Sequence, residues 1–386
     1  MTRAGVAERQ TRKQPGSAPR RLPPAFVPPY PPSWVDRLTA AVDRAPGPAW
    51  LTYLALGAAA VLLQLAVQQS TGAYRPGPFL PLHIWITGHF AYLLAMIHYL
   101  DRSAAAAVDT FRPVLQLSPS ESSADQQHMT YAELRYRLTT LPPRTTAWVA
   151  VIGGLILTLI PILFIQGPAG GAFSLARGIV SFGYSAAPMA LAAALLQLFL
   201  TQAIAATLVY HTVHQLRLIH HIYLRHTRLN LYRLQPLYAF SVPAALTAGG
   251  LLLYTYAWFA SGPALLGQWA SRALAVFFTG TAIVTFTWPL WGIHRRLAEE
   301  KKRLIQESSA RFESVVAQLH QRVDRQRLTQ MDDLNKTLAS LEIEQAALRR
   351  VPTWPWEPGT VRALAAALLV PLVVWVTQYI LQRFLG

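Results

Sequence analysis

The chain has 386 residues, of which 53% are hydrophobic, and its 34 Lys and Arg residues outnumber its 18 Asp and Glu residues, giving a formal net charge of +16. It contains no cysteine, which excludes disulfides, thiolate metal sites and cysteine nucleophiles. The hydrophobic residues gather in long blocks, and this pattern predicts an all-α, polytopic integral membrane protein.

The N-terminal segment, residues 1–48, combines basic residues with the proline-rich run 22–33. Such a composition buries too little apolar surface to fold, so we expect a disordered, basic cytoplasmic tail. A docking motif for a proline-reading domain is the alternative. No cleavable signal peptide is expected, because the first apolar block begins near residue 50, behind this polar tail.

Seven apolar blocks of about 20 residues follow, a length that matches the ~30 Å hydrocarbon core of a bilayer. None shows the period-2 alternation of a membrane β-strand, so each predicts a helix. The predicted spans are Trp50–Val67, Leu80–Leu100, Trp148–Ile165, Ala187–Tyr210, Tyr238–Phe259, Ala273–Trp291 and Val361–Leu381.

The distribution of basic residues predicts the orientation, because Lys and Arg are retained in the cytoplasm. With the N-terminus inside, only four of the 34 basic residues fall on the outer side, namely Arg75, Arg177, Arg272 and Arg383. All 18 acidic residues also fall on the inner side. We therefore expect a cytoplasmic N-terminus, an outer C-terminus, location in the plasma (inner) membrane, and attraction to an anionic inner leaflet rather than to nucleic acid.

The six-helix region 49–293 is expected to carry two cytoplasmic loops, 101–146 and 212–236. In the first, Thr130 and Glu133 can cap a helix over 131–139 that is stopped by Pro142 and Pro143. The fourth span continues as a helix beyond the bilayer, and we expect a bend near Asn230.

Histidines crowd the end of this extended helix. His211 and His214 lie at i and i+3, with His221 two turns beyond, so they are weak candidates for a metal site. The segment offers no carboxylate or thiolate to complete such a site, and a basic surface facing lipid phosphates is the preferred interpretation. Haem bound by His89 in the second span is also disfavoured, and we predict no metal and no cofactor.

The segment 294–350 contains no glycine or proline and predicts helix throughout. A straight helix of about 57 residues would end ~85 Å away, whereas the next ten residues span at most ~35 Å. The segment must therefore fold back as a cytoplasmic helical hairpin, with its turn between Asp324 and Asp333. Its second arm shows a coiled-coil seam, formed by Met331, Leu334, Leu338, Leu341, Gln345 and Leu348.

The final region, 351–386, is expected to form an elbow followed by the seventh span. The elbow holds Pro352, Trp354, Pro355, Trp356 and Pro358. Tryptophans suit the membrane interface and prolines stiffen turns, so an interfacial anchor is the preferred interpretation. A lever that links the hairpin to the seventh helix is the alternative.

The centres of the spans lack charged residues, which argues against ion-coupled transport. Their polar residues are neutral and can either join helices or line a pore of low charge selectivity. These candidates are Gln197, Thr201, Gln202, Thr281, Thr285, Thr377 and Gln378. No nucleotide-binding, metalloprotease or hydrolase motif occurs, so we expect a protein that is not an enzyme. An active site assembled only by folding is the alternative.

The order of parts resembles the insect odorant and gustatory receptor channels, which have seven spans, a cytoplasmic N-terminus and a cytoplasmic helical stretch before the last span. This resemblance covers topology alone, because Thr377–Phe384 does not match the spacing of the gustatory signature. It implies an oligomer assembled through the hairpin, with the seventh span along a central path. A membrane-anchored scaffold or sensor, whose hairpin recruits a cytoplasmic partner, is the alternative.

Overall fold

The computed structural model describes residues 26–72, 81–116, 130–159, 188–261, 269–326, 331–357 and 359–369. Regular structure in these ranges is helical, and their β pairing is limited to an isolated bridge between Leu115 and Thr227. The predicted all-α class is therefore confirmed for the described residues.

Four described helices are long and apolar enough to cross a membrane: α2 (Ala49–Ser70), α8 (Pro188–Arg225), the segment Gln235–Ser261 that includes α9 (Ser241–Ser261), and Arg272–Asp324 of α10 (Trp269–Asp324). They fit an integral membrane protein. The second expected span is present as α3 (Pro81–Phe111), which is not among these four. The third and seventh expected spans run partly outside the described residues, so the total of seven remains a prediction.

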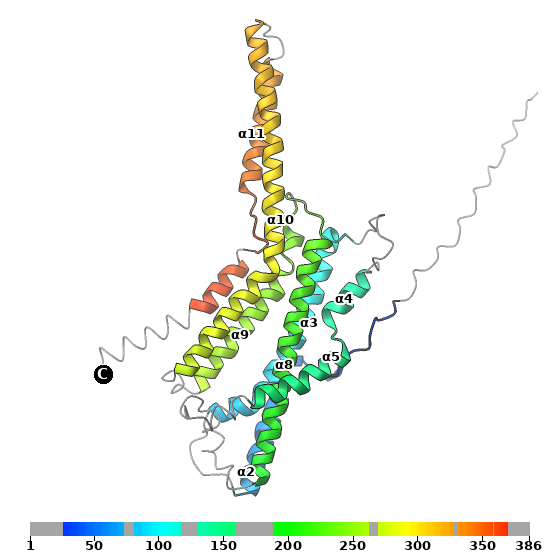
Figure 1. The fold of residues 1–386 in the computed structure, drawn as a ribbon, viewed down its shortest axis with the longest axis vertical. Coiled ribbons are helices and arrows are strands. Elements are labelled where there is room, and N and C mark those ends of the chain that lie inside the picture. The colour runs from blue at the N-terminus through cyan, green and yellow to red at the C-terminus, as the bar shows by residue number, and fades with distance from the viewer. Residues whose placement is uncertain are drawn as a thin grey trace, which may run out of the picture.

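Helix α3 lies in the middle of the bundle and packs against α2, α8 and α9 (Figure 1). Small residues allow the closest approaches. A Cβ atom added to Gly57 of α2 would lie 3.4 Å from the Cβ of Ala91, and one added to Gly154 would lie 2.9 Å from the Cα of Ala203 on α8. Such contacts bring helix backbones together where no hydrophobic effect drives association. Gly154 follows α5 (Pro143–Trp148) and the π-helical turn η2 (Val149–Gly153).

The expected disorder of the whole tail 1–48 is wrong for its second half, because α1 (Trp34–Arg44) forms there. Ser33 and Asp36 make a reciprocal capping box that satisfies orphan backbone donors at the helix start. Helix α1 is amphipathic, and Val35 is fully buried against α3. The helix therefore gains from the bundle the apolar burial that the tail could not provide by itself.

Two local predictions are confirmed. Helix α4 (Tyr131–Thr139) starts at Thr130, whose hydroxyl accepts a hydrogen bond from the Glu133 N–H at 3.2 Å. After α8, the side chain of Asn230 accepts a hydrogen bond from the Tyr232 N–H at 2.9 Å, which makes the expected bend. The chain then enters the 3₁₀ turn η4 (Gln235–Tyr238) and α9. The 3₁₀ turn η1 (Arg112–Val114) ends α3.

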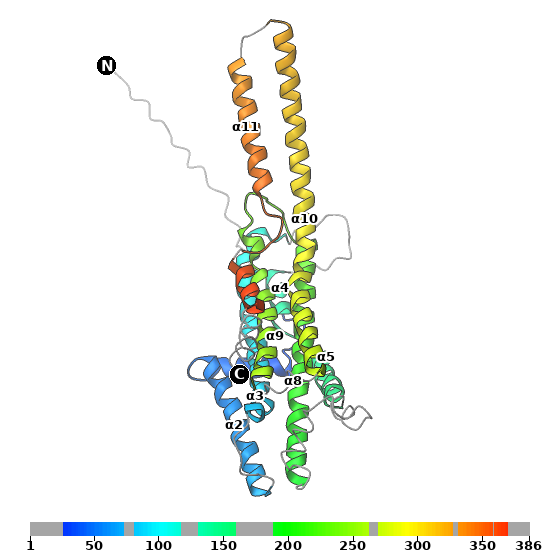
Figure 2. The ribbon, with the colours of Figure 1, turned by 90° about the vertical axis from the view of Figure 1, so that its left-hand side faces the viewer.

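Helix α10 continues without a break from the bundle into a long projection, and α11 (Met331–Arg350) lies beside it (Figures 1 and 2). At 1.5 Å per residue, the 56 residues of α10 extend about 84 Å. Pro289 lies inside α10, and proline removes a backbone hydrogen bond and favours a kink. We call residues 294–350 the arm. On α11, Leu334 and Leu348 are buried, and the other predicted seam residues are partly buried.

Candidate functional site

Titratable side chains gather where α1 and α8 pack against α3. We call this set the polar cluster, and it comprises Asp36, Asp43, His98, Asp101, Arg102 and His211. Its members come from helices far apart in the sequence, so the fold and not local structure brings them together.

The most buried pair of the cluster joins α3 to α8. The Nε2 atom of His211 lies 2.7 Å from a carboxylate oxygen of Asp101, and the two side chains are 2% and 14% exposed. In this dry setting each group compensates for the lost hydration of the other, and removal of one would leave the other unpaired. The pair is thus a joint between two helices that can also hold a proton.

A second set joins α1, α2 and α3. The Tyr53 hydroxyl lies 3.0 Å from Nδ1 of His98, and the other ring nitrogen of His98 lies 3.1 Å from a carboxylate oxygen of Asp43. Arg102 also pairs with Asp43. His98 is 5% exposed, whereas Asp43 and Arg102 are open to solvent on one side. One carboxylate from the end of α1 therefore receives two cationic or donor groups from α3.

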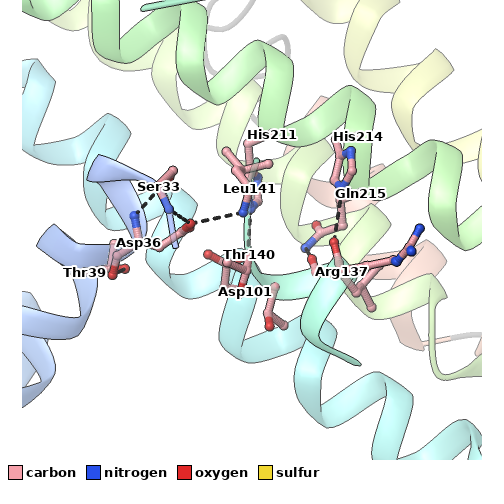
Figure 3. Close-up of polar contacts among 12 residues, drawn as sticks. Ser33, Asp36, Thr39, Asp101, Arg137, Thr140, Leu141, His211, His214 and Gln215 are labelled. Carbon is pink, nitrogen blue, oxygen red and sulfur yellow. Dashed lines mark hydrogen bonds and ion pairs between the residues drawn. The ribbon is translucent and has the colours of Figure 1, made fainter. Parts of the chain in front are cut away.

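Asp36 ties the start of α1 to the chain after α4 (Figure 3). Its Oδ2 atom accepts hydrogen bonds from the N–H of Ser33 at 2.8 Å and the N–H of Leu141 at 3.1 Å. Its other oxygen, like Nδ1 of His211, is buried without a hydrogen-bond partner among the described residues. Nε2 of His98 also lacks a hydrogen bond but has the Asp43 carboxylate at 3.1 Å, so the Asp36 oxygen and the His211 nitrogen are the least satisfied atoms of the cluster.

The chain before α1 is fixed to α4 by two tyrosines. The Tyr30 hydroxyl donates to the Thr140 carbonyl at 2.9 Å, and the Tyr136 hydroxyl donates to the Tyr30 carbonyl at 2.6 Å. Burial raises the pKa of Tyr30 to about 12, so its hydroxyl stays protonated and remains a donor at neutral pH. This part of the proline-rich run is therefore held against the protein.

The histidines that were weak metal candidates have separate partners. His211 pairs with Asp101 on α3, and Nε2 of His214 lies 3.0 Å from the Arg137 carbonyl at the end of α4 (Figure 3). The His221 ring lies 5.5 Å from that of His226. No group of three potential metal ligands occurs among the described residues. The expected lipid-facing basic surface is wrong for His211, which is buried beside a carboxylate supplied by another helix.

A second junction lies at the base of the arm, where two basic side chains of α10 each bind a pair of backbone carbonyls. The Arg296 guanidinium donates to the carbonyls of Tyr223 and Leu224 at 2.6 and 3.0 Å, at the C-terminal end of α8. The Lys301 ammonium donates to the carbonyls of Arg349 and Val351 at 2.8 and 2.7 Å. Cations at helix C-termini satisfy orphan carbonyls and complement the helix dipole. Residues of α10 therefore fix both α8 and the return chain.

Four rings stack in a row at the same base, and we call them the aromatic column. His294 stacks on Trp354 at 3.9 Å between centroids, Trp354 on Trp356 at 4.4 Å, and Trp356 on Phe286 at 5.5 Å. The Nδ1 atom of His294 also lies 3.1 Å from the Thr353 carbonyl. The column clamps both elbow tryptophans onto α10. Pro355 between them is buried, Pro352 is exposed, and Pro358 lies outside the described residues.

Two of the neutral polar residues of the spans donate hydrogen bonds to backbone carbonyls. The Gln197 amide donates to the Thr87 carbonyl on α3 at 2.6 Å, and the Thr281 hydroxyl donates to the Phe277 carbonyl of its own helix at 2.8 Å. Thr201 and Thr285 are buried, and Gln202 is half-buried. Thr377 and Gln378 lie outside the described residues. Within one copy of the chain, the Gln197 bond is a helix-to-helix contact.

Sequence reasoning missed the polar cluster. The sequence predicts Asp101 in a loop, and nothing in the local sequence links it to His211, which is 110 positions away. The capping box at Ser33 and Asp36 was a usable signal for α1. Comparison of this chain with family models, with curated proteins and with solved structures gives no match.

Proposed function

We propose that this chain is a non-enzymatic, receptor-like membrane protein that associates with further copies of itself through the arm. The supporting observation is the half-open seam of the arm. Of the six seam residues on α11, Leu334 and Leu348 are buried, whereas Met331, Leu338, Leu341 and Gln345 are only partly covered. Leu304, Phe312, Val315 and Leu319 on α10 are also only partly covered.

Two helices alone cannot enclose a wide apolar stripe, because each side chain needs neighbours on several sides. Two such pairs can enclose it as a four-helix bundle. A second copy offers a matching stripe by symmetry, and two-fold association is the commonest form of assembly. The firm base of the arm, with Arg296 and Lys301 bonded to backbone, would then fix the membrane bundles of the two copies relative to each other.

The test is the mass of the full-length particle in nanodiscs, compared with the Leu338→Lys variant. A lysine stem can still cover the seam of one hairpin while its ammonium reaches water, but it cannot sit in a closed four-helix core. We expect a defined oligomer for the wild type and a monomer for Leu338→Lys. The matched control is Ala339→Lys, an exposed neighbour, which should leave the oligomer intact.

Amide hydrogen exchange of α11 separates loss of assembly from loss of the arm itself. If α11 stays protected in Leu338→Lys while the mass falls, the seam is the interface. A wild-type monomer, or an oligomer that Leu338→Lys leaves unchanged, would contradict the proposal.

The second candidate is a membrane-anchored sensor or scaffold whose arm binds a different cytoplasmic protein. The bond from Gln197 to the Thr87 carbonyl favours it, because this polar side chain joins helices and is not free to line a path. This candidate would be supported if the wild type is a monomer that co-purifies with one defined protein from native membranes. The Leu338→Lys variant should then no longer co-purify with that protein.

A conducting path along the seventh helix is the finer form of the first proposal. It predicts that Gln378→Leu or Thr377→Leu changes conductance in reconstituted bilayers, whereas Val276→Leu, at an α10 residue that is 73% exposed, does not. Absence of any conductance in a confirmed oligomer would leave a receptor without a pore.

A further inference from the structure

An apolar groove runs along the bundle between α3, α9 and the short helix 359–369. Its volume is about 590 Å³, which is within the range of sites that hold small molecules. Tyr92 and Met96 of α3 form one wall, Gly249 and Leu253 of α9 the second, and Ala363 and Ala367 the third. The groove is separate from both junctions described above.

Apart from the hydroxyls of Tyr99 and Thr360 at one end, the lining offers nothing to attract water into the groove. It contains no acidic or basic side chain, and the Tyr92 hydroxyl is already used, because it donates to the Gly250 carbonyl at 2.6 Å. Water gains few hydrogen bonds against such a lining, whereas an apolar occupant gains dispersion contacts with it. Hydrocarbon therefore fits the groove better than water does.

The two glycines of α9 show how the hollow is made. A Cβ atom on Gly249 would meet nothing within 4 Å, so this position opens directly into free space. A Cβ atom on Gly250 would lie 2.8 Å from the end of the Met96 side chain, so this position lets methionine pack against the α9 backbone. Gly249 thus leaves space in the groove for an occupant, and Gly250 with Met96 forms the floor of the groove.

The groove is oriented along the helices and has a polar end. Tyr99, which is 61% exposed, and Thr360 line one end of the groove, whereas Leu253 and Ala367 line it farther along. From Thr360 to Ala367 the helix rises about 10 Å. Amphipathic tyrosines suit the boundary between headgroups and hydrocarbon, and α9 is one of the helices apolar enough to cross the membrane.

We propose that this groove is a binding site for one acyl chain of a membrane lipid, whose headgroup lies at the end marked by Tyr99 and Thr360. The apolar lining favours a hydrocarbon occupant, and the shape of the groove favours an elongated one. A bilayer around these helices would supply such a chain. The site needs no arm contact and stands independently of the assembly proposed above.

A second apolar groove, of about 640 Å³ between α2 and α3, serves as an internal comparison. It is walled by two helices, and its glycines are already covered, since Cβ atoms on Gly57 and Gly88 would lie 3.4 Å from Ala91 and 3.7 Å from Val61. We expect weaker retention of lipid there.

The test is photo-crosslinking of the full chain in phosphatidylcholine and phosphatidylglycerol vesicles that contain phosphatidylcholine with a diazirine on its acyl chain. Adducts are mapped by mass spectrometry. We expect adducts concentrated around Met96, Gly249 and Ala363, above the level at Val276 and Phe277, which are exposed on α10.

The deciding variant is Gly249→Leu, whose side chain fills the groove without a backbone clash. Adducts at the groove should fall roughly tenfold, because the site is occupied by protein. The matched control is Gly280→Leu on α10, where an added Cβ atom also meets nothing within 4 Å, and which should keep the wild-type adduct pattern.

Adducts spread evenly over the exposed apolar residues, or a groove signal unchanged in Gly249→Leu, would overturn the proposal. If Gly249→Leu does not fold, Ala363→Leu provides the same blockage from the opposite wall, because Ala363 is exposed and lines the groove. An unchanged groove signal in that variant would overturn the proposal equally.

Discussion

The membrane bundle and the arm use charged side chains in opposite ways. In the bundle, Asp101 with His211 and Asp43 with His98 and Arg102 join helices that are far apart in the sequence. On the arm, the ion pairs stay within one helix, as in Arg303 with Glu300 and Glu307, and Lys336 with Asp332.

This difference indicates which interactions determine the relative position of the helices in each region. A buried pair between helices fixes their relative position, because a mismatch would leave a charge unpaired in a dry site. A pair at i and i+4 on an exposed helix supports that helix alone, and its effect is small. Ion pairs between helices therefore contribute to the arrangement of the bundle, whereas those of the arm support only the helix that carries them.

The largest effect is expected from breaking the buried pair. Asp101→Ala should lower the free energy of unfolding by ~3–5 kcal/mol, because His211 remains buried without its partner. The measurement is unfolding in a detergent titration.

Its control is a double-mutant cycle with His211→Ala. We expect the double variant to lose less than the sum of the two single losses, because the pair acts as a unit. A loss below about 0.5 kcal/mol in Asp101→Ala, the usual size of a surface effect, would show that the two regions do not differ in this way.

An intermediate effect is expected at the base of the arm. Trp354→Ala removes one of the two inner rings of the aromatic column and should lower the stability of the elbow by roughly 1–3 kcal/mol, because ring pairs contribute ~0.5–1.5 kcal/mol each beyond burial. The readout is faster amide exchange in the elbow and at the end of α11.

Two controls sharpen this result. Trp354→Phe keeps a ring and should retain most of the protection, and Trp148→Ala, at a tryptophan that is 66% exposed, should leave the arm unchanged. Exchange at the arm base that is equal in all three variants would rule out the column as a clamp.

The smallest effect is expected from Asp332→Asn on α11. The side chains of Asp332 and Lys336 are 76% and 70% exposed, so the change should cost no more than ~0.5 kcal/mol. Amide exchange along α11 measures it. If Asp332→Asn lowered the free energy of unfolding as much as Asp101→Ala does, the ion pairs of the arm and of the bundle would not differ in their effect on stability.

The sequence predicted those features that depend on local patterns. The cap at Thr130 placed α4 correctly, and apolar block length identified the four span-length helices. The spacing of Leu334 and Leu348 also predicted which face of α11 is buried. Each of these follows from the periodicity or capping chemistry of one helix.

The candidate sites could not be predicted from the sequence, for a physical reason. Pairing of Asp101 with His211 depends on the rotation and depth of two helices, and neither is encoded by the composition of either one. The elbow tryptophans were assigned to the membrane interface by residue type, whereas their stacking on His294 and Phe286 requires the return chain to lie against α10. Both the Asp101–His211 pair and the stacking of the elbow tryptophans depend on tertiary packing.

The most direct measurement of arm-mediated assembly is the dipolar distance between copies carrying one spin label each. The chain has no cysteine, so a single cysteine introduced at the exposed residue Asn335 labels α11 alone. In nanodiscs, the proposal predicts a defined distance between labels on neighbouring copies, and predicts its loss in Leu338→Lys. A wild-type sample without any dipolar coupling would contradict the proposal that the arm joins copies of this chain.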